Sequence, residues 1–173
     1  MHRGLAVVAV VAALTGPSGA AARPLEPSGP SGCTISGTDG NDVLRGTSGH
    51  DVICGRNGDD AIVGFGGADR IVGGRGNDRI DGGPGADDLS GGRGADLVTG
   101  GGGDDRVDGG PSRDAVRGDA GSDVVQGGRG RDLCVATDDG IGGNDVANGG
   151  PGRDVYHADV GDVLVSVETA RSC

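Results

Sequence analysis

A repeat of nine residues runs through most of this chain and constrains its fold more than any other feature. Cut from Gly37, the sequence divides into eleven consecutive units that end at Val135, and two more units occupy 140–157. The first residue of all thirteen units is Gly, the sixth is always Asp, and the eighth is Leu, Ile or Val in ten of them. Random placement would not keep this register, so a regular structure positions these residues.

The composition excludes a conventional hydrophobic core. The chain of 173 residues holds 41 Gly, one Phe, one Tyr and no Trp, and its formal net charge is −11. Low hydrophobicity with high net charge is typical of disorder, whereas an ordinary domain of this length would bury several aromatic side chains. The strict register argues against disorder, which leaves a fold built from the repeats themselves.

The first residues have the features of a secretory signal peptide. A short basic start precedes the apolar run from Leu5 to Leu14, and small residues that end at Ala22 provide a cleavage site. The apolar run is too short to span a bilayer. We expect a signal peptide over 1–22, a Pro/Gly/Ser linker over 23–32, and a secreted, extracellular mature protein.

Each position of the unit has a physical role. Gly at positions one, two and four adopts positive φ without steric cost, which permits a tight turn with exposed carbonyl oxygens. The last three residues, such as Arg79–Asp81, alternate polar, apolar and polar, which predicts a three-residue strand with one buried side chain. The Asp at position six adds a carboxylate to the carbonyls. Oxygen ligands of this kind suit Ca²⁺ better than Mg²⁺, and no His or Cys recurs to bind Zn²⁺.

The units resemble the G-G-x-G-x-D-x-U-x nonapeptide of the RTX (haemolysin-type) calcium-binding repeats, where U is a large aliphatic residue. The resemblance covers Gly37 to His157. It implies an all-β fold, a right-handed parallel β-roll over 33–173, in which two units form one coil of 18 residues. It also implies that Ca²⁺ lies between turns one coil apart, and that 158–173 forms the degenerate last coil of a secreted bacterial protein.

Carried onto this sequence, the resemblance implies that the sixth residue of every unit is a ligand of Ca²⁺. Several ions would bind, each shared by units two apart, as for Asp78 with the turn of Asp96. The implied metal-binding residues are Asp42, Asp51, Asp60, Asp69, Asp78, Asp87, Asp96, Asp105, Asp114, Asp123, Asp132, Asp145 and Asp154.

Departures from the repeat allow the predicted metal sites to be ranked by expected strength. Ser112 replaces the fourth Gly, where a residue with a side chain is strained at positive φ. The four extra residues over 136–139 are expected to break the stacking register before the units of 140–157. We therefore expect the strongest sites in the central block, at Asp78, Asp87, Asp96 and Asp105, and weaker ones at Asp114, Asp123, Asp145 and Asp154.

The sequence offers no catalytic constellation. It contains neither an H-E-x-x-H zinc motif nor a G-x-S-x-G nucleophile motif. His50 and His157 are single, and we interpret them as surface residues. Neighbouring carboxylates such as Asp59 and Asp60 could mimic a hydrolase pair, but adjacent residues of an extended stretch point apart. We therefore predict that the protein is not an enzyme.

The predicted function is that of a secreted calcium-binding protein whose fold Ca²⁺ stabilises. Two alternatives stay open: an adhesion or interaction module at the cell wall, and the repeat portion of a secreted enzyme that lacks its catalytic domain. The acidic balance argues against nucleic acid as a partner, and no further apolar segment predicts a membrane span. The arginines of the units are placed outward, and we interpret them as a solubilising surface. The sequence does not identify a cell-wall or extracellular partner.

Four cysteines in a secreted chain suggest two disulfides, with three possible connectivities. In the coil that the resemblance implies, Cys54 and Cys134 would lie about 20 Å apart along the roll, at about 4.8 Å per coil. A disulfide requires Cα atoms within about 7 Å. The expected pairs are therefore Cys33–Cys54 and Cys134–Cys173, one at each end of the roll.

Overall fold

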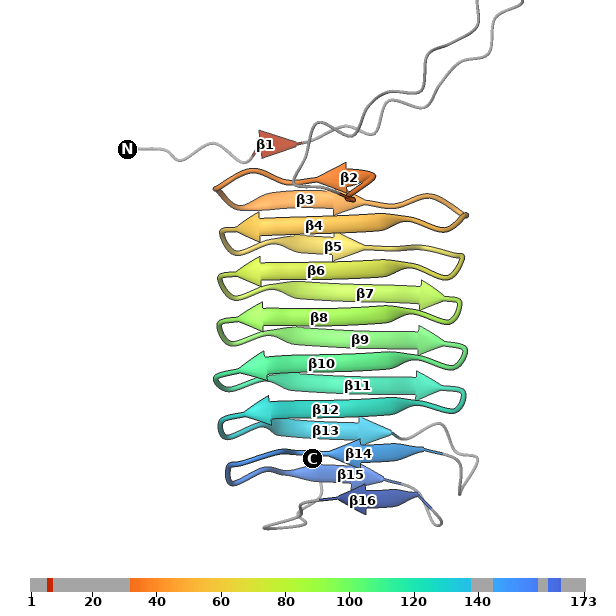
Figure 1. Cartoon of the computed structure of the whole chain (residues 1–173), viewed down its shortest axis with the longest axis vertical. Coiled ribbons are helices and arrows are strands. Elements are labelled where there is room, and N and C mark those ends of the chain that lie inside the picture. Colours follow the sequence, from red (N-terminus) through yellow and green to blue (C-terminus); the bar gives the residue numbers. More distant parts are fainter. Residues whose placement is uncertain (1–5, 8–31, 138–144, 159–161, 166–173) are drawn as a thin grey trace, which may run out of the picture.

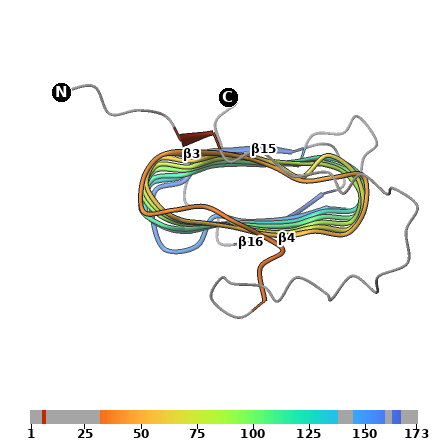
Figure 2. The same cartoon turned by 90° about the horizontal axis from the view of Figure 1, so that it is seen from above.

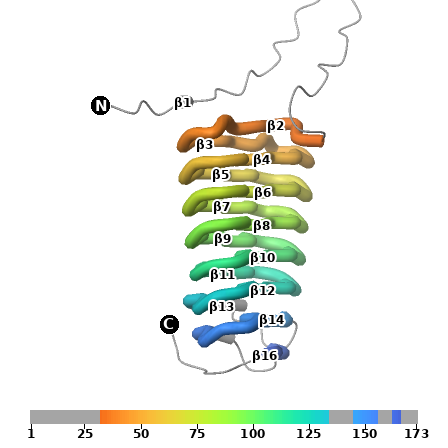
Figure 3. Tube along the Cα trace, turned by 60° about the vertical axis from the view of Figure 1, so that its left-hand side comes forward, coloured from red at the N-terminus to blue at the C-terminus, as the bar shows by residue number. Residues whose placement is uncertain are grey.

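The protein is a flattened coil of parallel strands. The computed structural model describes residues 6–7, 32–137, 145–158 and 162–165, and every regular element within them is a strand. Successive strands alternate between two parallel eight-stranded sheets, which face each other across a narrow interior (Figures 1 and 2). The coils stack regularly along one axis (Figure 3). The predicted parallel β-roll is confirmed.

The two sheets are named here by the numbering of their strands. In spatial order, the odd sheet contains β1 (Ala6–Val7), β3 (Asp42–Arg45), β5 (Ala61–Val63), β7 (Arg79–Pro84), β9 (Leu97–Gly102), β11 (Ala115–Ala120), β13 (Leu133–Thr137) and β15 (Tyr156–Ala158). The even sheet contains β2 (Ile35–Ser36), β4 (Val52–Asn57), β6 (Arg70–Arg75), β8 (Asp88–Arg93), β10 (Arg106–Pro111), β12 (Val124–Arg129), β14 (Val146–Asn148) and β16 (Val163–Val165).

The strands of the central coils are longer than the repeat predicts. They contain six residues, because the last three positions of one unit continue into the first three of the next. In β7 and β9, the pairing extends from Arg79 with Leu97 to Pro84 with Gly102. The expected length of three residues is wrong here, because the Gly-Gly-x segment keeps its backbone pairing with the neighbouring coil.

One inward side chain per strand forms the core. Where the structure describes their side chains, the eighth residues of the units are at most 1% exposed and form one column on each sheet, from Leu44 to Val116 on the odd sheet and from Ile53 to Ala147 on the even sheet. Burying a Val, Leu or Ile side chain stabilises the fold by about 1.5–3 kcal/mol. Ile35 of β2 extends the column by pairing with Ile53, although it precedes the first regular unit.

The stacking register continues past the four extra residues in the even sheet but shifts in the odd sheet. Val124 pairs with Val146 and Gln126 with Asn148, so β14 lies in register with β12. The odd sheet absorbs the irregularity as a shift between β11 and β13, where Ala115 pairs with Leu133 but Arg117 pairs with Ala136. The expected break before the last two units is therefore wrong for the even sheet, whose ladder resumes in register, and confirmed for the odd sheet, where Val135 rather than Cys134 pairs with Tyr156.

The first end of the roll carries a disulfide. Cys33, just before β2, is bonded to Cys54 of β4, and their Cα atoms are 6.0 Å apart. This confirms the first of the two expected pairs. The side chain of Cys134 and the whole of Cys173 lie outside the described residues, so the second pair stays a prediction.

Two described residues precede the roll. β1 pairs with β3 through Ala6 with Asp42 and Val7 with Val43. Both residues belong to the predicted signal peptide, so its cleavage would leave β3 as the outermost strand of the odd sheet. Among the described residues, no helix is long and apolar enough to cross a membrane.

Candidate metal sites in the turns

The thirteen aspartates predicted to bind metal all lie in the turns and point into the coil. Their exposed fractions are between 0 and 7%, although Asp is a residue that proteins rarely bury. They form two columns, because successive units turn at opposite ends of the flattened coil (Figure 2). The repeat therefore concentrates buried carboxylates along both edges of the roll.

From Asp60 onward, one oxygen of each carboxylate joins neighbouring coils. The backbone N–H of Asp78 donates to Asp96 Oδ1 at 2.8 Å, and that of Asp87 donates to Asp105 Oδ1 at the same distance. The same bond recurs from Asp42 to Asp60 onward, always one coil along. The structure thus brings together the pairs that the sequence predicts, two units apart.

The pattern continues past the extra residues. The N–H of Asp123 donates to Asp145 Oδ1 at 2.8 Å, and the N–H of Asp132 donates to Asp154 Oδ1 at 3.0 Å. The separation along the chain is 22 residues here, against 18 elsewhere. Both carboxylate columns are therefore continuous to the last two units.

The second oxygen of these carboxylates has no hydrogen-bond donor in most of the roll. It is buried and unpartnered in eight of them: Asp60, Asp69, Asp78, Asp87, Asp96, Asp105, Asp114 and Asp132. Nearly all buried polar atoms in proteins have a partner, and a buried charge without one is strongly unfavourable. A cation beside these oxygens would remove the penalty.

Burial also perturbs the protonation of the same residues. Loss of solvent raises the pKa of Asp60, Asp96, Asp114 and Asp132 from 3.8 to about 6, and that of Asp105 to about 7. The backbone hydrogen bond to Oδ1 opposes this rise, and the neighbouring carboxylates of the column add to it. Burial raises the pKa of Asp69, Asp78 and Asp87 as well. Without a positive charge nearby, these carboxyl groups therefore ionise less readily than an exposed aspartate.

The first glycine of the unit is needed for space. A Cβ on Gly91 would lie 2.6 Å from Asp96 Oδ2 and 2.7 Å from the carbonyl oxygen of Gly109, one coil further on. None of the first-position glycines that the structure describes has positive φ, so the expectation for that position is wrong. Positive φ occurs at positions two and four, as in Gly83 and Gly85. Carboxylate and carbonyl oxygens converge only because no Cβ separates them.

The available ligands favour a hard cation held largely by the backbone. Within the described ranges, no group of three or more His, Cys, Asp or Glu side chains lies close enough to hold a metal ion. An ion in a turn would therefore take a carboxylate oxygen and several carbonyl oxygens. Ca²⁺ accepts such sets, whereas structural Zn²⁺ sites require His and Cys.

The first two turns satisfy their carboxylates in a different way. Thr47 donates its backbone N–H to Asp51 Oδ2 at 2.7 Å and its hydroxyl to the same oxygen at 2.9 Å. Thr38 makes the same two bonds to Asp42 Oδ2. Sequence reasoning missed this arrangement, although Thr at position two was its visible signal. Oδ2 of these two carboxylates therefore has less need of a cation than in the central coils, although Asp42 Oδ1 is buried without a partner.

Non-glycine residues occupy four strained positions. Ser112 has a φ of 117° at the fourth position of its unit, which confirms the strain expected there. Arg56, Phe65 and Asp119 have positive φ at the second position of theirs. The turn geometry is therefore imposed by stacking even where the residue does not favour it.

A further aspartate extends one column. β16 pairs with β14 through Val146 with Val163, which places Asp162 beside Asp145. The N–H of Val163 donates to the carbonyl of Asp145 at 2.9 Å. Asp162 was not among the predicted ligands, although Asp-Val-Leu-Val from 162 to 165 matches the last four positions of the unit.

Adjacent carboxylates point to opposite neighbours. Asp60 Oδ1 accepts the N–H of Asp42 from the preceding coil, whereas Asp59 Oδ1 accepts the N–H of Asn77 from the following coil. Asp59 is exposed and Asp60 is buried. The pair therefore lacks the shared geometry of a catalytic carboxylate dyad, as the sequence predicts.

A parallel β-roll of glycine-rich nonapeptides with a buried aspartate in every turn defines a calcium-binding repeat solenoid. The family model of the RTX calcium-binding nonapeptide repeat matches four stretches, 34–62, 63–98, 99–134 and 139–164. The chain therefore belongs to the RTX calcium-binding repeat family. A search of curated proteins found no match to this chain.

Proposed function

We propose that this protein is secreted, is not an enzyme, and depends on Ca²⁺ for its folded structure. The observation that carries the proposal is the row of buried Asp Oδ2 atoms without donors in the central coils. Each ion would be held by a turn aspartate, such as Asp78 or Asp96, together with backbone carbonyl oxygens of stacked turns. Its positive charge would offset both the desolvation and the mutual repulsion of the column.

Binding of this kind couples directly to folding. The carboxylates and carbonyls converge only when coils are stacked, as the contact of Gly91 with the neighbouring coil illustrates. An unfolded chain would offer isolated aspartates with little affinity for Ca²⁺. The free energy of ion binding therefore adds to the stability of the roll.

Two features support secretion. The predicted signal peptide over 1–22 would direct export, and the Cys33–Cys54 disulfide suits an oxidising compartment. Extracellular Ca²⁺ is abundant, whereas cytosolic Ca²⁺ is kept low. A roll that folds when it meets Ca²⁺ would therefore assemble only after export.

The test is a calcium titration of the mature chain, followed by circular dichroism. The calcium-free protein should be largely unfolded, and added Ca²⁺ should induce β-structure cooperatively because each ion links adjacent coils. Mg²⁺ should be a poor substitute, because it requires a tight octahedron and loses water reluctantly. Identical spectra and melting temperatures with and without Ca²⁺ would show that the ions do not support the fold.

A second function, as an interaction module, is favoured by one observation. The outward arginines are not evenly distributed over the two faces of the roll. This uneven distribution carries the inference that follows.

A further inference from the structure

The outer surface of the even sheet is basic. Its strands carry six arginines against two aspartates: Arg56, Arg70, Arg75, Arg93, Arg106 and Arg129, with Asp88 and Asp108. The outward positions of the odd sheet carry three arginines against two aspartates: Arg45, Arg79 and Arg117, with Asp81 and Asp119. The alternation of units between sheets therefore gathers positive charge on one face.

The negative net charge of the whole chain does not reflect the charge of this face. Thirteen of its 26 acidic residues are the buried turn aspartates, which point inward. The remaining thirteen acidic residues are balanced by fifteen arginines. Within the described ranges, twelve arginines stand against eight acidic residues other than these thirteen, and the arginines of the even sheet form a distinct positive patch.

The arginines of this face stand in rows along the roll. Arg75 pairs with Arg93 in the neighbouring strand, and Arg129 pairs with Pro111. Arg70 lies beside Asp88, with Nε 4.0 Å from Oδ2. In the part of the chain that the structure describes, the exposed Arg75, Arg93, Arg106 and Arg129 make no ion pair. Four guanidinium groups are therefore available to a partner.

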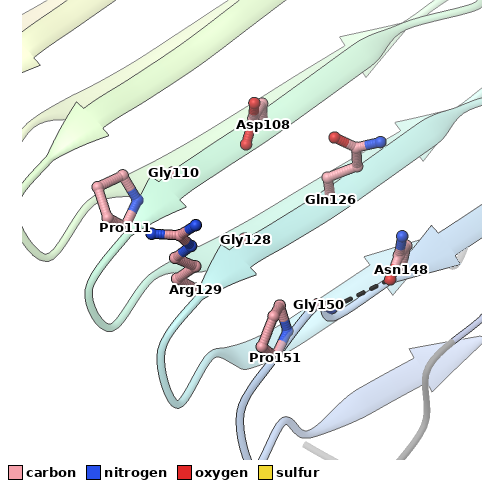
Figure 4. A pocket seen from close by; sticks show the side chains of 9 residues that line it. All are labelled: Asp108, Gly110, Pro111, Gln126, Gly128, Arg129, Asn148, Gly150 and Pro151. Carbon is pink, nitrogen blue, oxygen red and sulfur yellow. Dashed lines mark hydrogen bonds between the residues drawn. The ribbon is translucent and has the colours of Figure 1, made fainter.

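A trough runs along the C-terminal part of the same face. It crosses β10, β12 and β14 and has a volume of about 450 Å³ (Figure 4). Glycines form its floor, because Gly110, Gly128 and Gly150 carry no side chains. Its lining side chains are Asp108, Gln126 and Asn148 in one row and Pro111, Arg129 and Pro151 in the other. Each row repeats once per coil, at about 4.8 Å.

The lining matches the chemistry of a sugar chain. The amide and carboxylate groups of the first row suit hydroxyl groups, which both donate and accept hydrogen bonds. Asn148 Oδ1 already accepts the N–H of Gly150 at 3.0 Å, which orients its amide NH₂ group (Figure 4). The rings of Pro111 and Pro151 offer small apolar surfaces to ring C–H groups. Arg129 between them can bind a carboxylate or sulfate group.

Nucleic acid fits this face less well. Single strands bind largely through bases that stack on aromatic side chains. The strands of the even sheet contain no aromatic residue, and the chain has only one Phe and one Tyr. A repeating anionic chain that offers hydroxyl groups uses both the arginine row and the amide row.

We propose that the even sheet binds an anionic polysaccharide laid along the roll axis, with the arginine row over its acidic groups and the trough over its hydroxyls. The proposal rests on the proposed function, because the rows of arginines and amides form only when the coils are stacked, which the proposed function attributes to Ca²⁺. It replaces the interpretation of these arginines as a solubilising surface.

The test compares two variants with equal changes in charge. One replaces Arg75, Arg93 and Arg129 of the even sheet by Gln, and the matched control replaces Arg45, Arg79 and Arg117 of the odd sheet by Gln. Binding to dextran sulfate is measured in Ca²⁺ at physiological salt, where long-range effects of exposed charge are screened. The even-sheet variant should bind about tenfold more weakly or worse, and the control should change by less than about twofold.

Further arms identify the ligand class. Uncharged dextran of the same length should bind much more weakly than dextran sulfate, and a single-stranded DNA of equal charge should bind more weakly too. A Gln126→Ala, Asn148→Ala double variant should lose affinity for dextran sulfate more than for DNA. Equal loss in both arginine variants, equal binding of DNA, or no binding by the wild type would overturn the proposal.

Folding is measured separately from binding. Circular dichroism of each variant in Ca²⁺ reports whether the roll is intact, so failure to fold is not mistaken for failure to bind. A wild type that folds without Ca²⁺ would contradict the proposed function, but its binding to dextran sulfate could still be measured. If the wild type folds in Ca²⁺ but does not bind dextran sulfate, only the polysaccharide proposal is overturned.

Discussion

The two carboxylate oxygens of a sixth-position aspartate lie in different environments. Asp96 Oδ1 is anchored by the N–H of Asp78, while its Oδ2 is buried without a donor. The anchored oxygen fixes the rotamer, and the other is left facing the carbonyl of Gly109 across Gly91. A carboxylate prepared in this way requires little reorganisation on binding a cation.

The raised pKa values predict how pH acts without metal. The folded-state pKa of Asp105 is about 7 and that of Asp96 about 6, against 3.8 as the ordinary value. Between these values the folded protein binds more protons at these residues than the unfolded chain does, so their contribution to stability is fully present below about pH 4 and is lost as pH rises through 6 to 7. Acidifying the calcium-free protein from pH 8 to 5 should therefore increase its β-structure, as measured by circular dichroism.

The calcium-loaded protein provides the control for this prediction. Protons compete with Ca²⁺ for the same carboxylates, so acidification should raise the calcium concentration at the folding midpoint. Loss of β-structure in the calcium-free protein between pH 8 and 5 would contradict the assignment of these aspartates as the dominant buried charges.

At the scale of elements, the two ends of the roll differ from its middle. At the first end, Thr38 and Thr47 donate to the carboxylates of their own turns, and a disulfide joins β4 to Cys33, two residues before β2. At the other end, Leu164 of β16, the edge strand of the even sheet, pairs with the inward Ala147 yet is 37% exposed. The first end is thus stabilised by groups that do not require a metal.

Removing the disulfide should weaken the first end. Cys33 and Cys54 are separated by 21 residues, and closing a loop of that size stabilises a protein by about 3 kcal/mol. A Cys33→Ser, Cys54→Ser double variant should therefore require more Ca²⁺ at the folding midpoint and melt at a lower temperature. The measurement is a calcium titration and a thermal melt under non-reducing conditions.

The remaining cysteines supply the comparison. A Cys134→Ser, Cys173→Ser variant should also be destabilised if these residues are bonded, and peptide mapping without reductant should recover the Cys134–Cys173 linkage. A Cys54–Cys134 linkage would contradict both the predicted pairing and the straight stack of coils. An unchanged calcium midpoint in the first variant would show that its disulfide does not support the first coil.

At the scale of the whole molecule, the roll is a one-dimensional stack. Each coil contacts chiefly the coils before and after it, so stability is a sum of coil and interface terms. Both carboxylate columns and the core column of the even sheet run through the position of the extra residues. A defect in the middle of such a stack disturbs interfaces on both sides, whereas a defect near an end disturbs fewer coils.

This argument ranks the calcium sites. Asp96→Ala should raise the calcium midpoint more than Asp145→Ala, since Asp96 lies between regular coils whereas Asp145 lies beside the edge strand of the even sheet. The ranking follows from position in the stack, because the register at Asp145 is intact. Circular dichroism during calcium titration checks it, and an equal or larger effect at Asp145 would reverse it.

The sequence by itself determined the periodic features of this protein. Gly at position one, Asp at position six and an aliphatic residue at position eight carry the resemblance to the RTX repeat, which predicted a parallel β-roll with stacked aspartates. The positions of the cysteines within that roll then predicted the Cys33–Cys54 bond. These features follow from a repeat that advances by the same amount in every unit. Each unit then meets an equivalent unit one coil later, and a local pattern becomes a long-range one.

Only the tertiary structure decided what depends on contacts between coils. It showed that the strands extend through Gly-Gly-x and that the even sheet keeps its register past the extra residues. It also showed that Thr47 donates a hydrogen bond to Asp51 Oδ2. It also showed that the first Gly of the unit is needed for close approach, and that the arginines gather on the even sheet. The physical reason is that residues 18 positions apart share no local constraint in the chain. Their distances and donors are set only when the coils stack.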